Sequence, residues 1–194
     1  MFHFYPFLIY SFVTIFTPGP NNVMAMANGM HQGYRKTLRF LAGIFSGFFT
    51  VLLLGGFLNA SLSSVLPSLT IWIKLLGVVY MIYLAIHIIR SKPAEDSNTG
   101  VLYNSFKAGF LMQFINVKGI LYSITIFSSF IIPFYKDTKA IWLFSLFLAM
   151  MCFVSISCWA IGGNIFRKFL LKHYRPFNYA MGGLLIYTAI ASLV

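Results

Sequence analysis

The sequence predicts an all-α integral membrane protein of six transmembrane helices, arranged as two inverted three-helix repeats with helices 1 and 4 interrupted. Of its 194 residues, 59% are hydrophobic and only 9% are charged, whereas soluble domains carry about 25% charged residues. The apolar residues form six runs, each close to the length that crosses the roughly 30 Å hydrocarbon core of a bilayer. Most basic residues fall in short clusters between these runs, as expected for loops that face anionic lipid.

The six apolar runs predict one transmembrane domain over residues 1–194. We expect the spans near residues 4–28, 38–58, 67–89, 106–134, 141–166 and 177–194. The first run should stay in the protein, because no basic residue precedes it and no small-residue cleavage site follows early. Residues 1–90 form the first predicted repeat, 91–104 a polar cytoplasmic linker and 105–194 the second repeat. Three helices is an odd number, so the second repeat must enter the membrane from the opposite side.

The loop charges predict the orientation. One side of the membrane receives ten basic residues: Arg35, Lys36, Arg39, Arg90, Lys92, Lys107, Arg167, Lys168, Lys172 and Arg175. The other side receives only Lys136 and Lys139. By the positive-inside rule the ten-residue side is cytoplasmic and both termini lie outside. Trp72 and Trp142 then fall at the outer interface and Trp159 nearer the inner one.

A helix-breaking stretch interrupts the first span. It consists of Thr17, Pro18, Gly19, Pro20, Asn21 and Asn22. Because a proline lacks the backbone N–H, Pro18 and Pro20 should free the carbonyls of Thr14 and Phe16. Gly19 permits a sharp bend, and either asparagine can cap the helix that resumes. Bare backbone groups are tolerated in a membrane only where they face protein or a polar cavity, so the stretch is either a ligand site or a structural kink.

A second interruption is predicted inside the fourth span, over Gln113, Phe114, Ile115, Asn116, Val117, Lys118 and Gly119. Lys118 lies about 15 Å along the helix from the nearer membrane edge, so its side chain cannot reach water by snorkelling. A lysine at this depth costs on the order of 3 kcal/mol. The predicted spans hold no acidic partner, which leaves freed carbonyls, amide side chains, water or an anionic group on a substrate. Alternatively, Lys118 ties together the carbonyls of the first interruption.

Together, the two interruptions predict a site for an α-amino acid. Its carboxylate would pair with Lys118 and with the amide-rich N-terminus of a half-helix. Its ammonium would lie on the carbonyls of Thr14 and Phe16. The expected substrate-binding residues are Thr14, Phe16, Thr17, Pro18, Gly19, Pro20, Asn21, Asn22, Gln113, Asn116 and Lys118.

Other patterns bear on competing functions. No metal-ligand spacing, nucleophile elbow, Walker loop or selectivity filter is present, so we expect no enzyme, catalytic residue, metal or cofactor, and no nucleic-acid partner. Cys152 and Cys158 would lie about 9 Å apart along a helix, too far for a disulfide, which predicts reduced core residues rather than a thiol relay. Gly43 and Gly47 should allow close helix packing. Tyr122, like Ser123 and Asn164, could line a cavity or form interhelical hydrogen bonds.

Several motifs resemble the LysE/RhtB family of amino-acid exporters along nearly the whole chain. They are Thr17-Pro18-Gly19-Pro20, His31-Gln32-Gly33-Tyr34-Arg35, Leu41-Ala42-Gly43, and Gly77 with Tyr80. Where most members have Asn-Pro-Lys, this chain has Asn116-Val117-Lys118. With its flanking residues, that string is similar to the cysteine/O-acetylserine exporter branch.

The resemblance implies a bacterial inner-membrane exporter of cysteine and O-acetylserine, driven by the proton gradient. Lys118, His31 and His87 are the candidate titrating groups. The alternatives left open are the same carrier with homoserine, threonine or leucine as cargo, a membrane thiol relay and a channel. The expected partners are the amino acid and anionic phospholipid at the cytoplasmic loops, and a bundle this small often forms a homo-oligomer.

Overall fold

A computed structural model describes residues 3–61, 66–90, 104–135 and 137–191, and every regular element within these ranges is helical. The elements are α1 (Phe4–Phe16), α2 (Pro20–Gln32), α3 (Tyr34–Ser61), α4 (Leu66–Arg90), α5 (Phe106–Met112), α6 (Val117–Ile126), the π-helix η2 (Phe127–Ile131), α7 (Thr138–Ile165), α8 (Arg167–Lys172) and α9 (Tyr174–Ala191). Each of the six predicted runs coincides with one helix or with one broken helix.

Two of the described helices are each long and apolar enough to cross a membrane. They cover Tyr34–Asn59 in α3 and Thr138–Ile165 in α7. A third span results if α5 is combined with α6 and η2, across a bend of 57°. The helices also carry large apolar side chains on their outer faces, for example Leu143 at 68% and Tyr187 at 69% exposure. Such faces suit lipid rather than water, and the chain is an all-α membrane protein.

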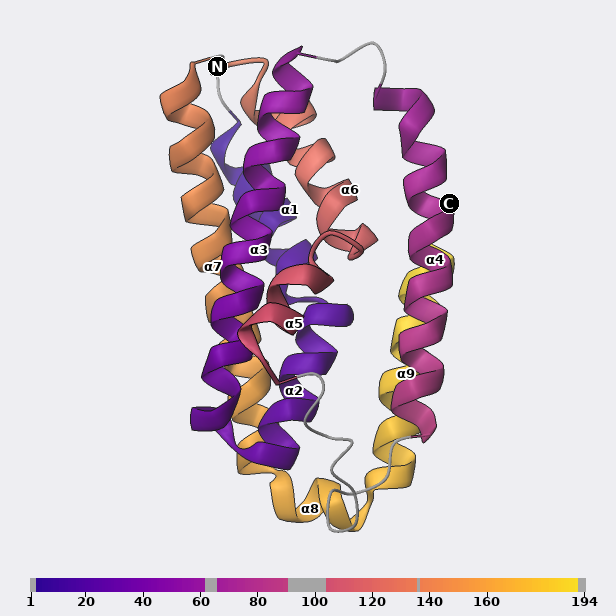
Figure 1. The fold of residues 1–194 in the computed structure, drawn as a ribbon. Helices are drawn as coiled ribbons and strands as arrows, with labels where there is room; N and C mark the ends of the chain where they lie inside the picture. The colour runs from indigo at the N-terminus through magenta and orange to yellow at the C-terminus, as the bar shows by residue number, and fades with distance from the viewer. Residues whose placement is uncertain (1–2, 62–65, 91–103, 136, 192–194) are drawn as a thin grey trace.

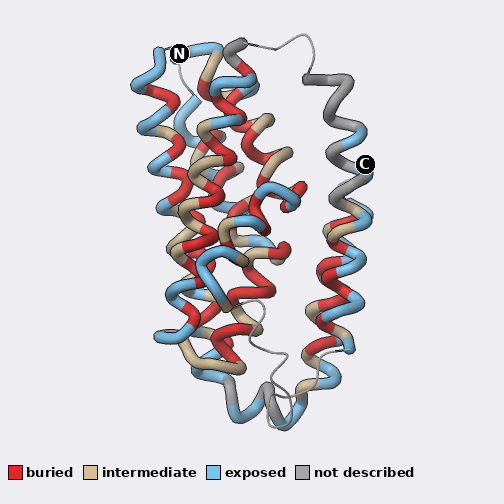
Figure 2. Tube along the Cα trace, viewed as in Figure 1, coloured by how far each residue is buried: buried red, intermediate tan, exposed pale blue. Residues whose placement is uncertain are grey.

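The helices form a main bundle with a helix pair at its side (Figure 1). Helices α1, α2, α3, α5, α6 and α7 make up the bundle, while α4 and α9 pack along each other and α4 contacts α6. Buried residues concentrate on the faces between helices, and exposed residues follow the outside of the bundle (Figure 2). The two breaks, between α1 and α2 and between α5 and α6, lie inside the bundle, so the bundle positions the candidate site.

The order of elements is the same in both halves of the chain. A broken helix (α1–α2, then α5–α6) is followed by a helix of 28 residues (α3, then α7). The last helix of each half, α4 or α9, belongs to the pair at the side. In Figure 1 each helix of the second half runs opposite to its counterpart in the first half.

Glycines allow the closest helix contacts. A Cβ added at Gly29 of α2 would overlap the carbonyl of Ala160 in α7, and one added at Gly163 would overlap the carbonyl of Met26. In the same way, Gly43 and Gly47 of α3 face the backbone of α5. The predicted packing of these two α3 glycines within the bundle is therefore confirmed.

Helix α8, the first residues of α3 and of α9 and the last residues of α4 lie at the lower end of the molecule in Figure 1. The exposed basic residues of these segments are Arg35, Lys36, Arg39, Arg90, Lys168, Lys172 and Arg175, and Lys107 is exposed in the first turn of α5. At the opposite end, Lys139 is exposed and Asp137 caps α7 by accepting a hydrogen bond from the Ala140 N–H at 3.2 Å. Lys92, Lys136 and the side chains of Arg167 and Lys74 lie outside the described residues.

Candidate functional site

The first break comprises residues 17–19, between α1 and α2. Helix α1 ends at Phe16, Gly19 is the N-cap of α2 in extended conformation (φ −171°), and Pro20 is its first residue. Proline suits that position because its ring fixes a helical φ and the missing N–H has no intrahelical acceptor there. The predicted interruption is confirmed, but the expected cap by Asn21 or Asn22 is wrong. Both asparagines lie within the first turn of α2 and bind elsewhere.

The carbonyls freed by the first break are bound by protein groups. Asn22 Nδ2 donates to the carbonyls of Ile15 and Thr17, both at 2.9 Å. Ser155 Oγ also donates to the Ile15 carbonyl, at 3.1 Å. The placement of a ligand ammonium on the carbonyls of Thr14 and Phe16 stays a prediction. In the structure each of these carbonyls accepts one side-chain hydrogen bond: the Thr17 hydroxyl donates to Thr14 at 3.0 Å and the Trp159 indole N–H to Phe16 at 3.3 Å. The indole N–H of Trp159 thus has an acceptor within the protein.

The second break comprises residues 113–116, between α5 and α6. Helix α5 ends at Met112 and α6 begins at Val117. Asn116 is the N-cap, and its side-chain oxygen accepts a hydrogen bond from the Gly119 N–H at 3.5 Å. The predicted interruption is confirmed here without any proline, and it places Lys118 in the first turn of α6.

Three side-chain amides, those of the half-buried Asn21 and of the buried Gln113 and Asn116, join the two breaks. Asn21 Nδ2 donates to Gln113 Oε1 at 2.9 Å, and Gln113 Nε2 donates back to Asn21 Oδ1 at 3.0 Å. Asn116 Nδ2 donates to the same Asn21 oxygen at 3.0 Å. Gln113 is 1% and Asn116 3% exposed, so these bonds satisfy amide groups that water cannot reach.

Lys118 crosses from the second break to the first. Its Nζ donates to the Thr17 carbonyl and to Thr17 Oγ1, both at 2.9 Å, and to the Pro18 carbonyl at 3.3 Å. This is the predicted alternative in which the lysine ties together the carbonyls of the first break. In the described part of the chain Asp137 is the only acidic residue, and it caps α7. The positive charge of Lys118 is therefore met by dipoles and not by a carboxylate.

A pocket with an empty volume of about 370 Å³, part of it open to the outside, lies where the two breaks meet. Its lining residues are Thr14, Ile15, Gly19, Pro20, Asn21, Asn22, Phe48, Asn116, Lys118, Gly119, Tyr122 and Cys152. The lining includes Pro20 at the start of α2, and Lys118 and Gly119 in the first turn of α6. Two positive helix ends and one lysine therefore share this pocket. Such a pocket attracts an anionic group.

Most of the predicted site residues come together. Seven of them line the pocket: Thr14, Gly19, Pro20, Asn21, Asn22, Asn116 and Lys118. The other four, Phe16, Thr17, Pro18 and Gln113, hold the lining in place through the hydrogen bonds described above.

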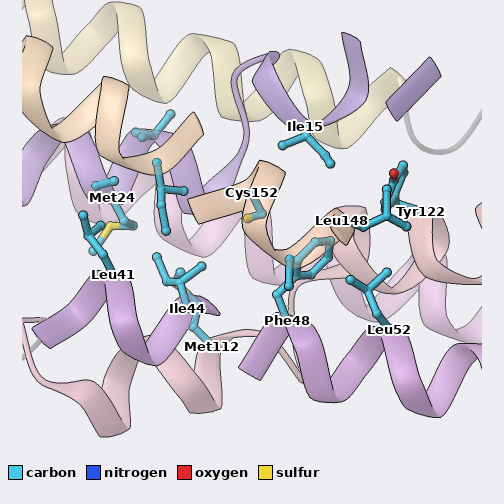
Figure 3. Packing of buried hydrophobic residues seen from close by; sticks show 14 of the residues in the cluster. Ile15, Met24, Leu41, Ile44, Phe48, Leu52, Met112, Tyr122, Leu148 and Cys152 are labelled. Atoms are coloured by element: carbon cyan, nitrogen blue, oxygen red, sulfur yellow. The ribbon is translucent and has the colours of Figure 1, made fainter. Parts of the chain in front are cut away.

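Sequence reasoning missed the apolar wall of the pocket. Ile15, Phe48 and Cys152 come from α1, α3 and α7, and Figure 3 shows the Cys152 side chain among the buried side chains of these helices. Of the wall residues, only Tyr122 had a signal in the sequence, as a polar residue able to line a cavity. Cys152 and Cys158 are both free thiols, but Cys158 is exposed, so its assignment to the core was wrong.

The comparisons with known proteins agree with one another. A family model described as LysE type translocator matches residues 12–194. A Klebsiella pneumoniae protein named cysteine/O-acetylserine efflux protein is 35% identical over 190 residues, covering 97% of this chain and 95% of its own length. A protein of the same name from Escherichia coli K12 is 35% identical over 187 residues, covering 95% and 94%. No solved structure matches the chain.

Proposed function

The chain belongs to the LysE type translocator family and is an amino-acid exporter, and from this premise we propose that it exports cysteine and O-acetylserine. We further propose that it is a secondary carrier of the bacterial inner membrane, driven by the proton gradient. The relatives that match over nearly the whole chain carry these two substrates in their names. The cargo that we propose for this chain is inferred from the names of these relatives.

The observation that carries the proposal is the pocket between the two breaks. An amino acid brings a carboxylate and an ammonium into the membrane, and neither is tolerated there without polar partners. Lys118 and the N-termini of α2 and α6 provide a positive environment for the carboxylate. The ring of Phe48, the ring of Tyr122 and the Ile15 side chain bound the remaining space, which favours cargo with a short side chain.

For the architecture we propose six spans in two inverted repeats. The repeated order of broken helix, long helix and peripheral helix supports it, as do the opposite directions of the two halves. In transporters of this kind the substrate binds at the repeat interface near the midplane, on the ends of discontinuous helices. The basic end would then face the cytoplasm, with its exposed lysines and arginines on anionic phospholipid, and both termini would lie outside.

The test is uptake into inverted membrane vesicles energised to be acid inside, because export then appears as accumulation in the vesicle. Labelled O-acetylserine, cysteine, homoserine, threonine and leucine are offered separately, with and without a protonophore. Saturable uptake of O-acetylserine or cysteine that collapses with the protonophore supports cargo and coupling together. Uptake of homoserine, threonine or leucine alone would show that the protein is a carrier of the same kind with a different cargo. Unsaturable flux with electrical current would identify a channel.

A pair of lysine variants tests the site in the same vesicles. Lys118→Met should lower uptake to near background at equal protein amount, because the carboxylate loses its cationic partner. Lys107→Met serves as the control, since Lys107 is exposed at the basic end of α5 and should transport like the wild type. Uptake by Lys118→Met at the wild-type rate would remove the assignment of the site.

A further inference from the structure

Three oxygen atoms surround the Lys118 ammonium, and we call them the ammonium cradle: the Thr17 carbonyl, Thr17 Oγ1 and the Pro18 carbonyl. Hydrogen bonds to residues other than Lys118 orient the two Thr17 oxygens. The Thr17 hydroxyl gives its hydrogen to the Thr14 carbonyl, so its oxygen can only accept from Lys118. The Thr17 carbonyl is also held by Asn22 at 2.9 Å. The cradle is thus built by the first break and not by Lys118.

The lysine side chain reaches the cradle across Gly19. An added Cβ on Gly19 would lie 2.9 Å from Lys118 Cδ and 3.2 Å from Nζ, and its three closest atoms all belong to Lys118. Because Gly19 has extended backbone geometry, alanine is allowed there conformationally. The missing side chain at this position therefore gives room to the lysine, which supplies the three nearest atoms.

We propose that the cradle is a binding site for a primary ammonium ion, filled by Lys118 in the empty carrier and by the amino group of the cargo in the loaded carrier. The inference rests on the proposed function and names the groups that exchange. A lysine ammonium and an α-ammonium each present three N–H donors, so the three acceptor oxygens serve either one. When the cargo ammonium displaces Lys118 from the cradle, the lysine forms an ion pair with the carboxylate of the same cargo in the pocket.

The exchange keeps charged groups paired throughout. An amino acid carries no net charge, so the pocket holds a single excess positive charge whether it is empty or loaded. A lysine with no acidic partner would be costly at this depth if it lost its dipoles. With the exchange, it leaves the carbonyls only when a carboxylate has arrived. The cradle thereby links occupancy of the pocket to the position of Lys118.

The experiment uses simple ions and no amino acid. Purified Lys118→Ala protein in lipid nanodiscs is heated with propylammonium, which replaces the missing part of the side chain, or with tetramethylammonium, which has the charge but no N–H. Propylammonium should raise the Tm of Lys118→Ala by about 2–4 °C at saturation, because it binds only the folded state. It should leave the wild type and the control Lys107→Ala unchanged, since Lys118 already fills their cradle. Tetramethylammonium should have no effect on any of them.

Gly19→Ala gives a second, independent route. The added methyl would lie 2.9 Å from Lys118 Cδ, so the lysine side chain must shift and we expect its hold on the cradle to weaken. Gly19→Ala should therefore lower Tm in the wild type but not in the Lys118→Ala background. It should also make the otherwise wild-type protein responsive to propylammonium. If Lys118→Ala does not fold, Gly19→Ala alone decides. An equal response of wild type and variants to propylammonium, or no response in a folded variant, would overturn the proposal.

The vesicle assay separates this failure from failure of the proposed function. A carrier that transports O-acetylserine but whose variants ignore propylammonium has the proposed function without the ammonium cradle. A protein whose Lys118→Ala variant binds propylammonium while the wild type transports no amino acid has the cradle without the proposed function.

Discussion

Single amides decide whether the two breaks stay together. Asn21 is the centre, because its oxygen accepts from both Gln113 and Asn116 and its nitrogen donates to Gln113. Asn21 lies at the first break, and Gln113 and Asn116 lie at the second, more than 90 residues away in sequence. Their hydrogen bonds form only when the two breaks pack against each other. Removing the shared partner leaves buried donors without acceptors, which is more costly than the loss of the bonds themselves.

Replacing Asn21 by alanine should therefore destabilise the protein. We expect a loss of about 1–3 kcal/mol, seen as a fall in Tm of several degrees in a thermal unfolding experiment in detergent. Ser129→Ala, on an exposed position of η2, is the control and should unfold at the wild-type temperature. Equal Tm values for the two variants would mean that the amide cluster does not hold the breaks together.

At this scale the sequence reveals the polar groups but not their partners. Lys118 could be singled out because a membrane-embedded lysine without an acidic neighbour demands carbonyls, amides or an anion. The sequence suggests a helix cap for Asn21, because capping is a local property. Its pairing with Gln113 across 92 residues depends instead on the packing of two helices. The position of Cys152 in the pocket wall could not be predicted from the sequence, because a small apolar thiol is equally common in a helix core.

Among the helices, α2 and α7 come close enough for backbone contact. Gly29 and Gly163 make this possible from the two sides of the contact. In a membrane, where helix association relies on close packing, such contacts contribute strongly to stability. The bundle around the breaks thus depends on the absence of two side chains.

Neighbouring glycines of α7 offer a matched test. Gly163→Ala should lower the unfolding free energy by about 1–3 kcal/mol, because the new methyl overlaps the Met26 carbonyl. Gly162→Ala meets no atom within 4 Å and should be neutral or slightly stabilising, since alanine favours helix. Thermal melts of the two purified variants at equal lipid content provide the comparison. A larger loss for Gly162→Ala would contradict the described contact.

The helices themselves could be predicted because apolar length and proline position are local signals. The first break follows from Pro18 and Pro20, and the second from Asn116 and Lys118 in an otherwise apolar run. The π-helical turn η2 could not be predicted. It needs one extra residue in the turn, and that choice depends on the neighbouring helices. The pairing of α4 with α9 at the side of the bundle is likewise a property of the assembled fold.

For the molecule as a whole, the uneven charge is the main guide to orientation. Of the basic residues, the exposed ones that belong to α8, to the start of α3 or of α9, or to the end of α4 lie at one end of the bundle. Their common location fits one membrane surface, and the positive-inside rule predicts that this surface is the cytoplasmic one. Whether the chain follows this rule stays a prediction.

Reporter fusions measure the orientation directly. Alkaline phosphatase fused after Val194 should be active, because that enzyme folds only outside the cytoplasm, and a green fluorescent protein at the same point should stay dark. Insertion of either reporter within residues 91–104 should give the reverse pattern. Fluorescence from the C-terminal fusion would place both termini inside and invert the proposed topology.

The different surroundings of Cys152 and Cys158 allow a native thiol to report on the pocket. One thiol borders the pocket and the other is exposed on the same helix. Replacing Cys158 by serine leaves a single native attachment point for a water-soluble methanethiosulfonate reagent. Its labelling rate then records when water reaches the pocket, and a bound cargo should slow that rate. Alternation between the two membrane faces can thus be followed by chemistry or spectroscopy without introducing a foreign cysteine.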